Sequence, residues 1–132
     1  MAELLVPISP GELIDKITIL EIKSARMTDD AKLHNVRTEL TLLTETWNAS
    51  EYSRKGDIGA EWAGLREVNG QLWDIEDEIR DRERDGQFDA RFIELARAVY
   101  VTNDERAALK RRINTKLGSA LVEEKSYKEY KK

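Results

Sequence analysis

Residues 8–22 read Ile-Ser-Pro-Gly-Glu-Leu-Ile-Asp-Lys-Ile-Thr-Ile-Leu-Glu-Ile and carry the start of the first predicted helix. Ser9 is a preferred N-cap residue, Pro10 suits the first helical position, and Glu12 completes a capping box three residues after the cap. The pattern predicts a helix from Pro10 to about Arg26. Its apolar residues lie on more than one side, which indicates either a central helix in a bundle or a subunit interface.

Three further amphipathic stretches predict three more helices, at about 30–47, 58–84 and 90–117. Gly86 and Gly118 suit the left-handed position that ends a helix. Because the first and second helices, and the third and fourth, have short connections, each pair should form an antiparallel hairpin. We therefore expect one all-α domain over residues 1–132: a four-helix bundle built from two antiparallel helical hairpins. The charged tail at 119–132 is expected either to fray or to dock late.

The composition excludes several classes of function. The 132 residues contain no cysteine, so disulfides, thiolate zinc sites and cysteine nucleophiles are excluded, and a reducing compartment is favoured. The net charge is −4 with both signs interspersed, so no nucleic acid partner is expected. Neither a leader peptide nor a long apolar run is evident, which predicts a cytoplasmic protein without a membrane partner. The dispersed glycines form no phosphate-binding loop, and we expect no cofactor.

A polar interruption on the fourth helix is the main candidate site. Alternating steps of four and three residues give Phe92, Ala96, Val99, Asn103, Arg106, Lys110, Ile113 and Leu117. A face that begins and ends as core should not carry polar residues in its middle unless they have partners. A hairpin turn at Gly86 would bring Asn69 of the third helix level with Arg106.

Two interpretations of this polar layer remain open. In the first, the layer is a satisfied network that fixes the helix register, or simply the exposed part of a long helix. In the second, Arg106 and Lys110 line a small pocket and bind a phosphate or carboxylate beside Asn103 and Asn69.

Acidic residues on the third helix suggest an alternative site. Asp74 with Glu78, and Asp77 with Asp81, have the i,i+4 spacing that places two carboxylates on one helix face, where they could hold magnesium. Residues 76–80, Glu-Asp-Glu-Ile-Arg, are similar to the E-E-x-x-E motif of all-α nucleotide pyrophosphohydrolases, but arginine replaces the last glutamate. A solvated face with i,i+4 ion pairs explains the same pattern, and we expect no metal in the leading interpretation.

Several segments together point to a family. Residues 7–21, 68–80, 100–114 and the ending at 123–127 resemble a family of small uncharacterised bacterial proteins, which are grouped as a domain of unknown function. The resemblance covers nearly the whole chain. It implies a bacterial, cytoplasmic, helical protein, and it implies no activity, cofactor or site residue.

Two function classes follow from these observations. The leading hypothesis is a non-enzymatic binding or interaction module, which accepts an anionic small molecule or an acidic protein partner around Arg106 and forms a homo-oligomer through its first helix. The alternative is a small-molecule enzyme that acts on a phosphorylated metabolite, with or without magnesium. The sequence leaves open whether the protein is an enzyme.

Overall fold

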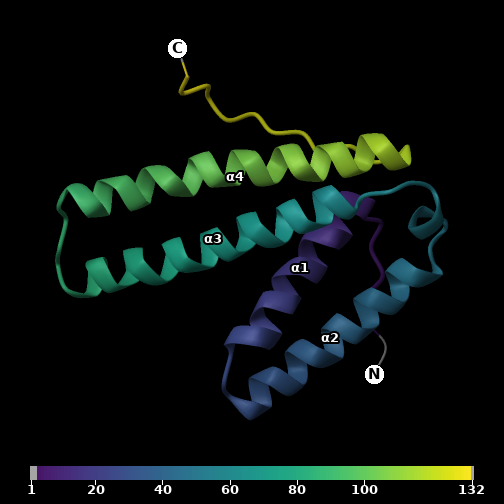
Figure 1. Cartoon of the computed structure of the whole chain (residues 1–132), viewed down its shortest axis with the longest axis horizontal. Coiled ribbons are helices and arrows are strands. Elements are labelled where there is room, and N and C mark those ends of the chain that lie inside the picture. The colour runs from purple at the N-terminus through teal and green to yellow at the C-terminus, as the bar shows by residue number, and fades with distance from the viewer. Residues whose placement is uncertain (1–2, 132) are drawn as a thin grey trace.

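The computed structural model describes residues 3–131, and in that range the regular structure is helical. It consists of α1 (Pro10–Arg26), α2 (Asp30–Ala49), the short 3₁₀ helix η1 (Glu51–Arg54), α3 (Gly59–Arg84) and α4 (Ala90–Leu117). The helices α1 and α2 form one antiparallel hairpin, and α3 and α4 form a longer one (Figure 1). The predicted all-α four-helix bundle of two antiparallel hairpins is confirmed.

Hydrogen-bond acceptors from the residue before α1 and from α4 cap the N-terminus of α1. The Ser9 hydroxyl accepts a hydrogen bond from the backbone N–H of Glu12 at 3.2 Å, as the capping box predicts. Pro10 has no N–H, and the N–H of Gly11 donates to the side-chain oxygen of Asn114 at 2.7 Å. The N–H groups that a helix start normally leaves unpaired are therefore occupied, and one of their acceptors comes from α4.

The other predicted helix boundaries are also confirmed. The side chains of Asp29 and Asp89 accept N–H hydrogen bonds in the first turns of α2 and α4. Gly86 and Gly118 each have a φ angle of 66°, the left-handed conformation in which glycine has no steric penalty. Local sequence signals therefore account for where these elements begin and end.

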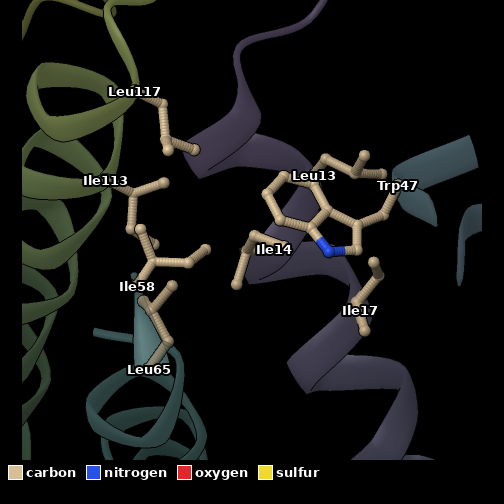
Figure 2. Packing of buried hydrophobic residues seen from close by; sticks show 8 residues of the cluster. All are labelled: Leu13, Ile14, Ile17, Trp47, Ile58, Leu65, Ile113 and Leu117. Atoms are coloured by element: carbon tan, nitrogen blue, oxygen red, sulfur yellow. The ribbon is translucent and has the colours of Figure 1, made fainter. Parts of the chain in front are cut away.

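The hydrophobic core surrounds α1, which packs against α2, α3 and α4. Its main cluster comprises Leu13, Ile14, Ile17, Trp47, Ile58, Leu65, Ile113 and Leu117. Figure 2 shows Ile14 between the side chains of α3 and α4 on one side and Trp47 on the other. This central position explains why α1 is apolar on more than one side. Self-association through α1 stays a prediction.

The longer hairpin extends past the core as a two-helix arm, which we define as residues 75–84 of α3 and 90–99 of α4 (Figure 1). An ion pair of 2.5 Å between Arg26, the last residue of α1, and Asp74 marks its base. Within the arm Leu95 is buried but Ile79 is only half-buried, because each helix has a single neighbour there. Despite their length, neither these helices nor any other helix in residues 3–131 is apolar enough to cross a membrane.

Candidate functional site

Three hydrogen-bonded pairs connect α4 to the start of α1, with their α4 members one helical turn apart. We call them the polar ladder: Arg106–Asp15, Lys110–Glu12 and Asn114–Gly11. Residues four apart on a helix share one face, so a single row of α4 side chains makes all three pairs. The two helices run antiparallel here, since the residue numbers rise on α4 as they fall on α1.

The first pair holds a buried carboxylate. The Asp15 side chain is only 1% exposed. Its Oδ1 accepts hydrogen bonds from Nε of Arg106 at 2.8 Å and Nδ2 of Asn69 at 3.0 Å, and its Oδ2 accepts one from Nη2 of Arg106 at 2.5 Å. Asn69 also donates to the Thr18 hydroxyl at 3.0 Å. The hydrogen bond to Asp15 raises the pKa of Arg106 despite partial burial, so the guanidinium stays charged.

The second pair belongs to a network with the chain's C-terminal segment. Lys110 Nζ lies 2.7 Å from Glu12 Oε2 and 3.0 Å from Glu123 Oε2, and its side chain is 11% exposed. Burial alone would lower the pKa of Lys110, but the hydrogen bonds to Glu12 and Glu123 outweigh it and raise the pKa. The ammonium group is therefore charged at neutral pH.

The third pair requires a glycine. A Cβ atom at Gly11 would overlap the carbonyl oxygen of Lys110 and lie 2.9 Å from the side-chain oxygen of Asn114. The absence of a side chain lets α1 approach α4 closely enough for the Gly11 N–H to reach Asn114. The same close approach brings Glu12 within reach of Lys110.

A cleft of about 250 Å³ lies between α4 and the C-terminal segment. Its charged lining residues are Lys110, Arg111, Glu123 and Lys125, and Ala107 and Ala108 supply small side chains. Hydrogen bonds from Lys125 and Lys110 lower the pKa of Glu123 from 4.5 to about 2. The cleft therefore carries fixed charges of both signs, with one carboxylate and one cation on the tail side and two cations on the helix.

The structure brings some of the predicted site residues together. Arg106 and Asn69 meet at Asp15, which they both contact, so the predicted alignment of α3 with α4 is seen without a direct bond between them. Asn103 is exposed and lies at the limit of hydrogen-bond distance, 3.5 Å, from Nη1 of Arg106. The predicted site consists of Asn69, Asn103, Arg106 and Lys110. In the described part of the chain, Lys110 is the one member of this set that lines the cleft.

The sequence patterns did not identify the acidic half of this site. Asp15 lies one helical turn from Ile19 and two from Ile22, on the second apolar side of α1. A carboxylate on an apolar face needs a cation, so this position was a usable signal for a partner of Arg106. Asn114 and Glu123 had no comparable signal, because their contacts depend on how the helix and the tail are placed.

The four acidic residues of the alternative metal site are spread along α3: Asp74, Asp77, Glu78 and Asp81. Arginines occupy three of them. Asp81 pairs with Arg84 at 3.2 Å. Asp74 pairs with Arg26, and Glu78 accepts two hydrogen bonds of 2.6 Å from Arg91. Residues 3–131 contain no group of three or more histidine, cysteine or acidic side chains placed to hold a metal ion. The magnesium-dependent alternative stays a prediction.

Fold and site together define a small all-α protein in which ion pairs cross the interface of two helical hairpins. The chain matches the model of a family described as a family of unknown function, DUF6165, over residues 4–130, and it belongs to that family. This confirms the resemblance to proteins grouped as a domain of unknown function. No curated protein and no solved structure matches the chain.

Proposed function

We propose that the protein is a non-catalytic binding module that accepts an anionic group, a phosphate or a carboxylate, on α4 beside Lys110. One observation carries this proposal: Lys110 lines a cleft and already holds a carboxylate that an exposed segment delivers, Glu123 at 3.0 Å. A ligand anion would take the position of Glu123. The bound group belongs either to a small molecule or to an acidic partner protein.

The neighbouring charges favour the same kind of ligand. Arg111 lines the cleft and its side chain is 61% exposed, so it can reach a second oxygen of the anion. Arg106 lies one turn away on α4 and is fixed by Asp15. Its guanidinium is committed to both oxygens of Asp15 and does not make the first contact with the ligand.

The direction of the pKa shifts favours binding over proton transfer. A general acid or base works best when its pKa lies near the working pH. The pKa values of Lys110 and Arg106 are raised from already high values, and that of Glu123 is lowered to about 2. These groups keep their charges at neutral pH, which suits a fixed recognition surface.

The test is a titration of the full chain with inorganic phosphate at pH 7 and constant ionic strength, followed by the amide NMR signals. We expect saturable shifts at residues 107–111 and 123–125. Lys110→Gln should weaken the affinity at least about tenfold, because a hydrogen bond to a charged group contributes roughly 1.5–3 kcal/mol. The control is Lys32→Gln on the exposed side of α2. Equal affinities for the wild type and Lys110→Gln would refute the proposal.

A further inference from the structure

The C-terminal segment lies on α4 as an extended strap. After Gly118 the chain turns back, and Figure 1 shows the tail following the last turns of α4 and then rising away from the helix toward the C-terminus. The turn is supported by the Ser119 hydroxyl, which donates to the carbonyl oxygen of Leu121 at 2.8 Å. Residues 120–131 are all exposed, so the segment adheres to one face of the helix without entering the core.

Three contacts hold this strap to α4. Glu123 contacts Lys110 at 3.0 Å, Glu124 contacts Arg111 at 3.4 Å, and the rings of Tyr130 and Tyr100 meet edge to face with centroids 4.9 Å apart. From Arg111 to Tyr100 α4 rises about 16 Å, and six extended residues reach at most about 20 Å, so an extended tail can make both contacts as it runs back toward the start of α4.

The contacts are of a kind that another segment can replace. The Glu124 and Arg111 side chains are 72% and 61% exposed, and ion pairs between exposed groups contribute little to stability. The apolar side chains of Leu121 and Val122 are 44% and 54% exposed, so the strap buries little apolar surface. A segment with the same charges and better apolar contacts would displace it.

We propose that this face of α4 is a docking groove for an extended acidic segment of a partner protein, and that residues 119–131 occupy the groove as a placeholder. The proposal rests on the proposed function of Lys110 and names its partner class. The contacts define the ligand chemistry: two adjacent carboxylates for Lys110 and Arg111, then an aromatic ring six residues later for Tyr100. Because Ala107 and Ala108 have small side chains, a peptide backbone has room to lie against α4 in the cleft.

A second copy of the chain is a poorer occupant than a different protein. Its tail would make the same contacts that the chain's own tail makes. The attached tail has the advantage of a high effective concentration, in the millimolar range for short connections. Only a segment with additional contacts gains from displacing it.

The experiment measures the affinity of a fluorescent peptide of residues 119–131 for full-length protein by anisotropy. A tail-released variant carries Glu123→Ala, Glu124→Ala and Tyr130→Ala. All three positions are exposed, so the core stays intact, and circular dichroism verifies this. We expect this variant to bind the peptide at least about tenfold more tightly than the wild type, since the competing tail is gone. Lys110→Gln in the same background should abolish the gain, because Lys110 makes the less exposed of the two ion pairs.

Matched controls separate the possible outcomes. A peptide with glutamine at the positions of Glu123 and Glu124 should not bind, and Glu129→Ala in the full chain should leave the affinity unchanged. Equal affinity for wild type and tail-released protein overturns the docking groove. If phosphate still binds at Lys110 in that case, the proposed function survives alone. A wild-type dimer that becomes monomeric in the tail-released variant also overturns the proposal, because the tail then serves a second copy.

Discussion

Asp15 is the residue on which the centre of the molecule depends. A carboxylate that is 1% exposed is strongly destabilising unless hydrogen bonds and a counter-charge surround it. Arg106 supplies the charge in a two-point contact, and Asn69 supplies a further donor. Because all of these groups are hydrogen-bonded to one another, the arrangement around Arg106 favours the interpretation of the polar layer as a satisfied network over that of an open pocket.

Replacing Arg106 should therefore destabilise the fold. Arg106→Met retains much of the side-chain volume but leaves the charge of Asp15 unpaired, and we expect the free energy of unfolding in urea to fall by about 3–5 kcal/mol. The double variant Asp15→Leu with Arg106→Met should recover most of the loss. Arg97→Met, on the exposed face of α4, is the control and should change little. A more stable Arg106→Met variant would instead indicate a strained charge of the kind kept for ligand binding.

At the same scale, the sequence predicted one half of the site and missed the other. Arg106 and Lys110 interrupt an apolar seam, and Asn69 aligns with Arg106 by counting from the turn at Gly86. The structure places Asn103 on the exposed side of α4, because α1 crosses the helix on another face. Asn114 could not be predicted, since its partner Gly11 lies 103 residues away and has no side chain to suggest a contact.

Among the elements, α1 and α4 approach each other closely where they cross at Gly11. The overlap that a Cβ at Gly11 would have with the Lys110 carbonyl involves backbone, which cannot move aside as a flexible side chain would. Gly11 therefore sets the distance at which α1 and α4 cross, and the lengths of the hydrogen bonds in the polar ladder depend on that distance.

The substitution Gly11→Ala should lower the free energy of unfolding by about 1–3 kcal/mol, the usual effect of overpacking. Gly70→Ala on α3 is the matched control, because its Cβ would approach nothing closer than the end of Arg26 at 3.8 Å. Alanine there should stabilise the protein by about 0.5–1 kcal/mol through helix propensity. Chemical denaturation of the two variants measures both effects, and similar values for the two would contradict the close approach.

The C-terminal strap should respond to acid before the helices do. The pKa of Glu123 is lowered from 4.5 to about 2, so its contribution is present above pH 4.5 and is lost as the pH falls through about 2. We expect the NMR signals of residues 123–131 to move toward random-coil positions over this window. Glu123→Gln should show the released signals already at pH 7. If the NMR signals of residues 123–131 change only at the pH at which those of α1 change, the strap is not released before the helices unfold.

For the molecule as a whole, packing is uneven along its long axis. The core cluster gathers where α1 meets α3 and α4, whereas the two-helix arm has one helix–helix contact and a half-exposed apolar seam. The amphipathic patterns predicted the helices and their hairpins. They did not predict which end of the long hairpin would project, although residues 74–84 of α3 are mostly charged and were a usable signal for the projecting end.

Hydrogen exchange should follow this division. We expect amides of residues 75–84 to be at least about tenfold less protected than those of residues 65–70 in the same helix, because arms with few buried contacts open locally. The comparison within α3 is its own control for helix propensity and solvent conditions. Uniform protection along α3 would mean that the arm is covered in solution, as it would be by a second molecule.

The bond between Gly11 and Asn114 also has a consequence for biosynthesis. The ribosome releases α1 first, with apolar residues on more than one side, but one of its packing partners, α4, is the last helix to appear. Contacts so distant in sequence form late, because the loop between them must close first. Part of the apolar surface of α1 therefore stays uncovered until α4 has emerged, and chains that stop short of Asn114 should be recognised by chaperones and proteases.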